Sequence, residues 1–452
     1  MGKKTETGSR SMVAEAVQVA WPAVLESFFV ALAGMIDTMM VSTMGSYAVA
    51  AVGLTQQPKF IGLAVFFSIN VAVSALVARR KGEGNQKNAN TILLTALVMV
   101  LALCVVVTAA SVALAAPFMH LAGSNPQTHD SAVTYFRIIM GGTVFNVISL
   151  TINAGQRGSG NTRIAMTTNV TSSIVNVIFN YLLIGGNLGF PRLGVAGAAI
   201  ATVLGTVVAC FMSIASLFHH NSYVSFRWMK ELRFRPNMGD TRRIARFGSN
   251  MFVENLAMRV GFVATAVLAA RLGTDEFAAH NVGMNVLGLA FSFADGMQVA
   301  AVALSGQALG AGEKQKAIRY GNICQRIGFG ISVVLSALLL IGGRWFYGLY
   351  FQDEAIIQMG LLINRFTTVI VLLQISQIIF GGCLRAGGDV RYTLMGSLVS
   401  VTAIRTIVTI VFTLVIPLGL SGIWLGVLSD QFSRFVFMSL RFRQGKWVNI
   451  AL

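Results

Sequence analysis

The sequence predicts an all-α polytopic membrane protein, with twelve transmembrane helices arranged in two six-helix lobes. Three observations lead to this fold class: an apolar composition, recurring apolar segments of membrane-spanning length, and a repeat between the two halves of the chain. Of the 452 residues, 55% are hydrophobic and only 11% are charged, too few charges to cover a soluble domain. The first ten residues, MGKKTETGSR, form a polar tail, and we expect no cleaved signal.

Apolar segments that could span a bilayer, which takes about 20 residues, recur twelve times. Some exceed that length and are expected to tilt or to extend beyond the hydrocarbon. Pro22 and Pro58 are expected to kink the first two segments. We expect the spans at residues 13–43, 48–79, 91–116, 131–156, 164–187, 194–218, 242–271, 276–307, 319–342, 356–383, 392–416 and 420–440.

Lys and Arg residues concentrate in alternate loops, and the opposite loops carry only Arg192, Arg271 and Arg344. Cytoplasmic loops hold the excess of basic residues, so both termini are expected in the cytoplasm, with the chain in the plasma (inner) membrane. The net charge of +17 follows from this topology, so we expect membrane lipids and no nucleic acid as partners. The expected organisation is a cytoplasmic tail at 1–12, an N-lobe at 13–218, a cytoplasmic linker at 219–241, a C-lobe at 242–440 and a tail at 441–452.

The two halves repeat when the sequence is shifted by 228 residues, with no gap over some 140 residues. The shift places Glu26 on Glu254 and aligns the turn R-x-x-G-N-x-R at 157–163 with R-x-x-G-D-x-R at 385–391. An even number of helices in each half gives both halves the same orientation in the membrane. This predicts a pseudo-two-fold axis along the membrane normal and a transport path between the lobes.

The sequence also excludes several classes of function. It contains no Walker A, GxGxxG or GxSxG motif, so a pump would use an ion gradient and not ATP. The five histidines form no pair at metal-ligand spacing, and no nucleophile or acid/base set marks an enzyme, so we expect no cofactor. The four cysteines are far apart in apolar segments and are expected to be small core residues: Cys104, Cys210, Cys324 and Cys383.

The first span carries two carboxylates, Glu26 and Asp37, in a segment apolar enough to enter a bilayer. A charge in hydrocarbon costs several kcal/mol, so these acids are functional candidates. Eleven residues bring a helix back to within roughly 20° of the same face, about 16 Å along the axis. One face of one membrane helix therefore carries both acids.

Together these features resemble the multidrug and toxic compound extrusion (MATE) family over essentially the whole chain. The resemblance lies in P-x-x-x-E and the later aspartate of the first span, in Gly-x-Gly after the second and eighth spans, and in the R-x-x-G-[ND]-x-R turns. It implies membership of the MOP flippase superfamily and export of amphipathic, often cationic, drugs or toxic metabolites in exchange for H⁺ or Na⁺. The implied mechanism is rocker-switch alternating access, and we expect a monomer.

The DinF-like branch of the family resembles this chain most. That branch uses the aspartate of helix one as its coupling acid, which Asp37 matches, and it places asparagines near that acid, which Asn153 and Asn176 match. Where the branch often has a second aspartate, this chain has Asn180. A buried carboxyl group can load and release a proton, and amide and hydroxyl oxygens, including that of Thr38, could instead help it bind Na⁺.

The other bacterial branch couples through acids in helices seven and ten. In this chain Glu254 lies one turn off that register, and helix ten offers Gln374 and Gln377 in place of an acid. By the repeat, Glu26 and Glu254 share a role, either capping or gating the lobes or contacting an ion or substrate. Asp295 is a further candidate for substrate or ion contact, or it pairs with an intramembrane base.

Four basic residues also fall within apolar runs. Either they form salt bridges with Asp295, Glu26 or Glu254, or they snorkel, or they line an anion-binding cavity. Methionines such as Met258 and Met284 either pack helices or line a promiscuous pocket. The main alternative function is therefore flipping of a lipid-linked oligosaccharide or another anionic substrate. The four basic residues are Lys59, Arg259, Arg365 and Arg405.

Overall fold

The computed structural model describes residues 2–219, 222–231 and 236–450, and every regular element within them is a helix. Contacts divide the chain into two compact units. Unit 1 consists of Met1–Val24 and Val253–Leu452, and unit 2 of Leu25–Phe252. The division falls inside α1 (Gly2–Ser42) and α10 (Met238–Leu272), so each of these helices contributes to both units.

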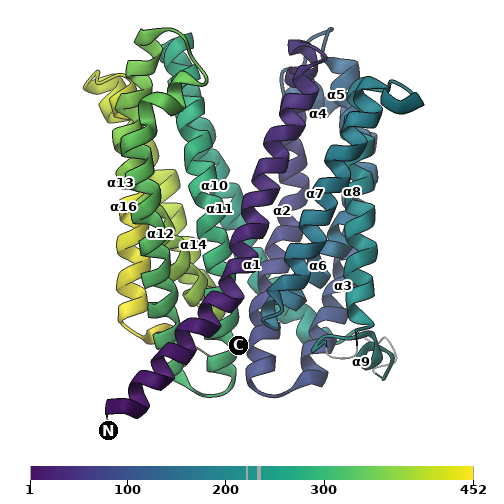
Figure 1. Ribbon diagram of the computed structural model, residues 1–452, viewed down its shortest axis with the longest axis vertical. Helices are drawn as coiled ribbons and strands as arrows, with labels where there is room; N and C mark the ends of the chain where they lie inside the picture. The colour runs from purple at the N-terminus through teal and green to yellow at the C-terminus, as the bar shows by residue number, and fades with distance from the viewer. Residues whose placement is uncertain (1, 220–221, 232–235, 451–452) are drawn as a thin grey trace. The chain divides into compact units, whose positions relative to one another are not determined.

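Unit 2 is a helical bundle in which α2 packs against α3, α5 and α6, and α7 packs along α8 (Figure 1). Between bundle helices the chain makes short turns, and α9 packs against α3. The elements are α2 (Ser46–Gly82), α3 (Gln86–Ala113), α4 (Ala115–Leu121), α5 (His129–Gly141), α6 (Thr143–Gly158), α7 (Thr162–Gly185), η1 (Asn187–Gly189), α8 (Gly194–Leu217) and α9 (Phe226–Glu231).

Unit 1 is built around α13, which packs against α11, α12 and α16 and is 83% buried over its most apolar stretch. The early part of α1 adds Ala16, Val19 and Ala20 to the same core. Besides α10, the elements are α11 (Thr274–Gly310), α12 (Lys314–Gly348), α13 (Glu354–Ala386), α14 (Val390–Ser397), η2 (Leu398–Arg405), α15 (Thr406–Ile410), η3 (Val411–Val415), α16 (Leu420–Arg443) and η4 (Lys446–Asn449).

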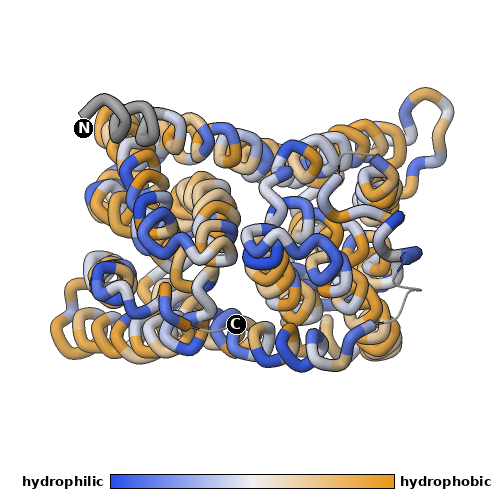
Figure 2. The backbone as a smooth tube through the Cα atoms, turned by 90° about the horizontal axis from the view of Figure 1, so that it is seen from below, coloured by the Kyte–Doolittle hydropathy of each residue, from blue (hydrophilic) through white to orange (hydrophobic). Residues whose placement is uncertain are grey.

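The all-α polytopic fold class is confirmed. Each predicted span falls on a helix or a run of helices, and in the described residues nine helices are long and apolar enough to cross a membrane, ten with the bent pair α5–α6. Figure 2 shows long apolar stretches along the helices and hydrophilic stretches in the turns nearest the viewer. Helices α7 and α16 fall outside the apolar set, and both carry polar residues inside the bundle, such as Asn180 and Asp430.

Two predicted spans are less regular than expected. The span 131–156 is broken at Gly142, where α5 and α6 meet at 47°. A Cβ atom at Gly142 would lie 2.6 Å from both Val203 methyl carbons, so only glycine allows this approach to α8. The span 392–416 contains two π-helical stretches, η2 and η3, which have a wider turn than an α-helix. By contrast, helices α1 and α2 continue through Pro22 and Pro58.

The predicted linker 219–241 is partly structured. Its residues 220–221 and 232–235, with Arg233 and Arg235, lie outside the described residues. Before α9, Asn90 of α3 donates to the Tyr223 carbonyl at 3.1 Å and accepts from the Ser225 amide at 2.9 Å. The linker is therefore hydrogen-bonded to α3 of unit 2. After the linker, α10 begins at Met238, slightly before the predicted residue 242.

The four cysteines are buried and free, as expected for small core residues. Other small residues set the distances between helices. A Cβ atom at Gly158 of α6 would overlap the backbone carbonyl oxygen of Ser74 in α2.

Replacing Gly158 by alanine is expected to destabilise the protein by about 1–3 kcal/mol, because a backbone atom cannot move aside as a side chain can. Thermal unfolding of the purified protein measures this effect. Gly141→Ala is the matched control, since a Cβ atom there meets nothing within 4 Å. Equal melting temperatures for the two variants would contradict the close packing of α2 on α6.

Candidate functional site

The candidate site in unit 2 is centred on Asp37, which lies five residues before the end of α1 and is half-buried. Asn180 of α7 donates a hydrogen bond from its side-chain nitrogen to Asp37 Oδ1. Asn180 is fully buried, and its own Oδ1 has no hydrogen-bond partner within the described part of the chain. A carboxylate and an amide oxygen that still accepts hydrogen bonds thus lie on neighbouring helices.

A second asparagine supports the first. Asn180 Nδ2 also lies 3.4 Å from Asn176 Oδ1, and Asn176 Nδ2 donates to Thr202 Oγ1 of α8 at 3.1 Å. The tight packing of α7 on α8 makes this chain of contacts feasible. At Gly205 a Cβ atom would lie 2.7 Å from the Ser172 carbonyl oxygen. Polar contacts therefore run without a break from Asp37 on α1, through Asn180 and Asn176 on α7, to Thr202 on α8.

Lys59 of α2 is close enough to Asp37 for the two charges to attract each other. The sequence analysis weighed pairing of Lys59 with Asp295, Glu26 or Glu254 against snorkelling and an anion-binding cavity, and it did not consider Asp37. Asp37 and Lys59 lie on consecutive helices, α1 and α2, joined by the turn at 43–45.

Two expected partners of Asp37 lie elsewhere. Asn153, fully buried on α6, donates to Ser149 Oγ at 3.4 Å and accepts from Ser213 Oγ at 3.2 Å. Asn153 stands near the opposite end of its helix from the α5–α6 bend, so it binds α8 instead of α1. The Thr38 hydroxyl donates to the Gly34 carbonyl at 3.0 Å along its own helix.

Glu26 forms a second buried polar cluster in unit 2. Arg157 Nη2 and Asn169 Nδ2 both donate to Glu26 Oε1, and Glu26 is 5% exposed. Arg157 belongs to the R-x-x-G-N-x-R turn that follows α6. Glu26 thus ties α1 to the end of α6 and to α7.

Glu254 makes the matching cluster in unit 1. Arg385 Nη2 donates to Glu254 Oε1 at 2.9 Å, and Ser397 Oγ donates to the same oxygen at 2.8 Å. The sequence separations, 131 and 143 residues, are those of the two Glu26 contacts. Each glutamate is bound by the arginine at the equivalent position of the two repeated R-x-x-G motifs. The structure therefore favours a structural role over ion coupling for both glutamates.

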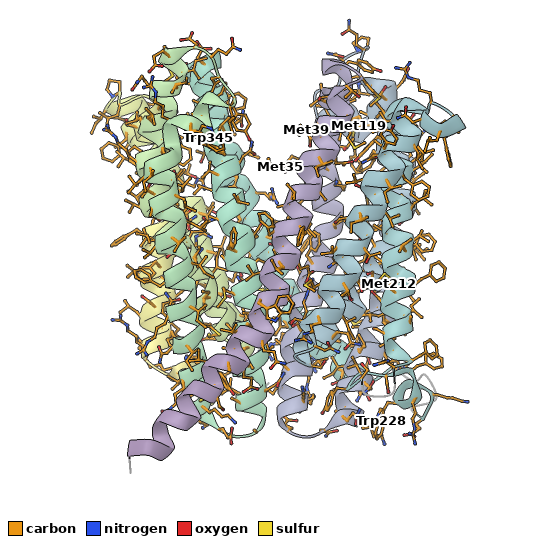
Figure 3. All side chains as sticks on the ribbon, in the orientation of Figure 1. Met35, Met39, Met119, Met212, Trp228 and Trp345 are labelled. Atoms are coloured by element: carbon orange, nitrogen blue, oxygen red, sulfur yellow. The ribbon has the colours of Figure 1, made fainter. Side chains whose placement is uncertain are left out.

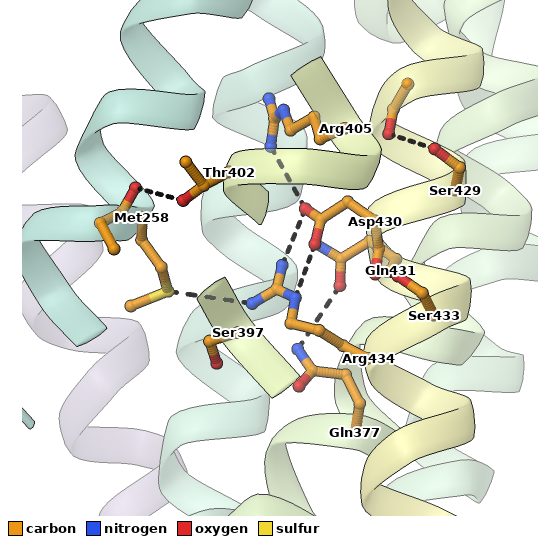
Figure 4. A network of polar contacts seen from close by, with 12 residues as sticks. Met258, Gln377, Ser397, Thr402, Arg405, Ser429, Asp430, Gln431, Ser433 and Arg434 are labelled. Atoms are coloured by element: carbon orange, nitrogen blue, oxygen red, sulfur yellow. Dashed lines mark hydrogen bonds and ion pairs between the residues drawn. The ribbon is translucent and has the colours of Figure 1, made fainter. Parts of the chain in front are cut away.

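Unit 1 holds a further charged cluster around Asp430 (Figure 4). Arg434 is bound to both carboxylate oxygens, at 2.7 and 3.0 Å, and Arg405 Nη1 lies 3.4 Å from Oδ2. The sequence analysis expected Arg405 to pair with Asp295, Glu26 or Glu254, which is wrong. It did not single out Asp430 and Arg434, although an acid and an arginine four residues apart within an apolar span are a recognisable signal.

The other candidates are distributed through unit 1. Gln377 donates to Gln431 Oε1 at 3.4 Å, and Gln374 lies 3.5 Å from the Leu287 carbonyl, so both serve helix packing. Three more are half-buried, Arg259 and Met258 on α10 and Asp295 on α11, while Met284 packs against the core. Arg365 is exposed on α13. In unit 2, Met35 and Met39 are 53% and 68% exposed on α1 (Figure 3).

The Asp37 cluster can hold a proton or a hard monovalent cation. Its ligand atoms are carboxylate, amide and hydroxyl oxygens, the atoms that such cations prefer. Within the described residues no three His, Cys, Asp or Glu side chains gather in a way that could hold a metal ion.

Removing the Asn180 amide is expected to change cation binding at Asp37 by about tenfold, since a hydrogen bond to a charged group contributes about 1.5–3 kcal/mol. Proton binding should strengthen, because the amide no longer stabilises the carboxylate, whereas Na⁺ binding should weaken, because the amide oxygen is lost as a ligand. The measurement is the cation concentration that gives half-maximal transport in Asn180→Ala. Asn153→Ala is the control, because its amide bonds to Ser149 and Ser213. An unchanged cation dependence in Asn180→Ala would remove Asn180 from the site.

Comparison with known proteins places these features in a family. The family model MatE matches residues 22–182 and again residues 251–411, so the same model recognises both halves of the chain. A "Probable multidrug resistance protein NorM" of Thermotoga maritima is 27% identical over 439 residues, which are 96% of this chain and 92% of that protein. An "Uncharacterized transporter YisQ" of Bacillus subtilis is 23% identical over 95% of this chain and 94% of that protein.

Solved structures share the fold. "Outward-facing conformation of a multidrug resistance MATE family transporter of the MOP superfamily" superposes with a TM-score of 0.88 at 23% identity, covering 96% of this chain and 97% of that one. "Crystal structure of MATE in complex with MaL6" superposes with a TM-score of 0.87 at 23% identity over the same shares.

Proposed function

Because this chain belongs to the MatE family of membrane transporters, and so is a transporter and not an enzyme, we propose that it exports amphipathic, often cationic, small molecules. In this proposal export is driven by inward exchange of H⁺ or Na⁺. The relatives' names as multidrug resistance proteins support the substrate class. A bacterial plasma membrane, cytoplasmic termini, a monomer and lipid contacts at the basic loops complete the proposal.

The observation that carries the coupling step is the hydrogen bond from the buried Asn180 to the half-buried Asp37. Asp37 can exist as a carboxylate or as a neutral, cation-loaded group. A cation that binds one conformation of the transporter better than the other shifts the balance between them, and only this difference in affinity can drive exchange. In the proposed cycle, loading of Asp37 from outside expels the drug and permits return to the inward-open form by a rocking motion.

Reconstitution into proteoliposomes tests the proposal. With a pH gradient or a Na⁺ gradient imposed separately, one of the two should drive ethidium transport, and an anionic substrate should not compete. Transport of ethidium that responds to neither gradient would reject the exchange mechanism.

The alternative, flipping of a lipid-linked oligosaccharide or another anionic substrate, is favoured by the basic residues within the spans. Lys59 is close enough to Asp37 for the two charges to attract each other, and Arg405 forms an ion pair with Asp430. Arg365 is exposed. Because Lys59 and Arg405 each lie near an acid, the argument for a basic cavity is weaker, and drug export remains the better proposal.

A further inference from the structure

The repeat shows what unit 1 has in place of the Asp37 site. With the shift of 228 residues, Asp37 falls on Thr265, whose hydroxyl accepts a hydrogen bond from Arg405 beside Asp430. Each unit thus has an acid in this neighbourhood, but on a different helix. In unit 2 it is the half-buried Asp37 on α1, and in unit 1 it is the fully buried Asp430 on α16.

The surroundings of the two acids differ in charge. Asp37 accepts a hydrogen bond from a neutral amide, Asn180, and Lys59 attracts it without forming an ion pair within the described residues. Asp430 receives a bidentate contact from Arg434, with Nε to Oδ1 at 2.7 Å and Nη2 to Oδ2 at 3.0 Å. The bidentate geometry is the strongest arrangement of this ion pair. Both carboxylate oxygens of Asp430 are therefore already bound by a cation that belongs to the chain.

Arg405 adds a second fixed cation. Its Nη1 lies 3.4 Å from Asp430 Oδ2 (Figure 4). Its Nε donates to Thr265 Oγ1 at 2.8 Å, and its guanidinium stacks 4.7 Å from the Phe262 ring centre. Arg405 is the last residue of the π-helical stretch η2, whereas the equivalent part of α7 is α-helical. The π-helix, a frequent mark of functional sites, changes which residues face α16.

The cluster is closed to solvent. The side chains of Arg405, Asp430 and Arg434 are 1%, 0% and 9% exposed. Arginine cannot be deprotonated in proteins, so two positive charges and one negative charge persist at any physiological pH. A cation arriving from solution would meet a net positive charge and an acid whose two oxygens already contact guanidinium groups.

We propose that Arg405 and Arg434 are tethered counter-cations that occupy Asp430 permanently, so that unit 1 does not respond to the coupling cation and exchange is confined to Asp37. This inference rests on the proposed function, in which Asp37 is the exchanging acid. It assigns Arg405 and Arg434 as determinants of ion stoichiometry: they keep the transporter to one exchanging carboxyl group. Removing both guanidinium groups should convert Asp430 into a second cation site.

The test measures the melting temperature of the purified full-length protein as Na⁺ is raised at constant ionic strength, or as the pH is lowered. In the Asp37→Asn background, where the proposed site is removed, the cation response should vanish. Adding Arg405→Met and Arg434→Met should create a new response of at least about 2 °C. Adding Asp430→Asn as well should abolish it. Arg365→Met, at an exposed arginine of the same unit, is the control and should create no response.

Two results would overturn the inference. One is a cation response in Asp37→Asn that disappears on adding Asp430→Asn, because Asp430 would then exchange cations with its arginines in place. The other is a folded double-arginine variant with no response dependent on Asp430. A cation response in Asp37→Asn that persists after Asp430→Asn is added would instead count against Asp37 and the proposed function. The added response due to Asp430 in the double-arginine variant would still be measurable above it.

If the double-arginine variant does not fold, stability decides the question. The inference expects Asp430→Asn to restore folding to that variant, because the unpaired buried carboxylate is then gone. If the variant with all three substitutions also fails to fold, the arginines serve packing, and their role as counter-cations is rejected.

Discussion

Asp37→Asn is expected to abolish cation-driven export while leaving the protein folded. Asparagine keeps the shape of the side chain and a hydrogen-bonding oxygen, but it cannot exchange between a charged and a cation-loaded state. Efflux of ethidium from cells or proteoliposomes should fall to the level of empty controls. The amount of protein in the membrane should match the wild type, which separates lost coupling from lost folding.

The control for this variant is Asp130→Asn. Asp130 is exposed in the first turn of α5, in the same unit, so it removes a carboxylate without touching the Asn180 cluster. Its efflux should stay close to the wild-type value. Efflux by Asp37→Asn at the wild-type rate would show that another group couples the cation.

Glu254→Gln is expected to destabilise unit 1 by about 3–5 kcal/mol, the cost of leaving one partner of a buried ion pair alone. Arg385 would lose its charge partner, and Ser397 would lose a charged acceptor. Denaturant unfolding of the purified protein in detergent measures the change. In Glu254→Gln/Arg385→Gln the loss should be clearly smaller than the sum of the two single losses, because no unpaired charge remains.

An exposed ion pair in the same unit provides the comparison. Arg344 and Glu354 lie 3.0 Å apart with side chains 66% and 56% exposed. Glu354→Gln should cost at most about 1 kcal/mol, since water and salt screen such pairs. If Glu254→Gln lowers the free energy of unfolding no more than Glu354→Gln does, Glu254 does not stabilise unit 1 through its ion pair. A role in ion or substrate contact would then be the better interpretation for Glu26 and Glu254.

The sequence predicted the helices and the duplication well, because hydrophobic length and a constant 228-residue shift are properties of the chain alone. The bend at Gly142 was missed, since it depends on contact with Val203, which lies two helices later in the sequence. The π-helical stretches were missed for a similar reason. Hydropathy indicates that a segment is apolar and long enough to span a membrane, but it does not distinguish a π-helical turn from an α-helical one.

Prediction of the site was weaker than prediction of the helices. The cost of a charge in the membrane singled out Asp37, Glu26 and Glu254, and all three have polar partners on neighbouring helices. Their partners were harder to predict, because contacts between helices depend on depth and rotation. Asn153 and Asn180 are both asparagines within spans, yet only Asn180 reaches Asp37.

Drug-triggered cation flux tests the central claim most directly. Proteoliposomes hold the transporter and an internal pH-sensitive dye, or take up labelled Na⁺, and the drug is supplied on the side from which it is exported. The account predicts that drug addition triggers opposite movement of one of the two cations by the wild type, and that Asp37→Asn shows no such flux although it still binds the drug. Equal drug-triggered flux in both proteins would contradict the account.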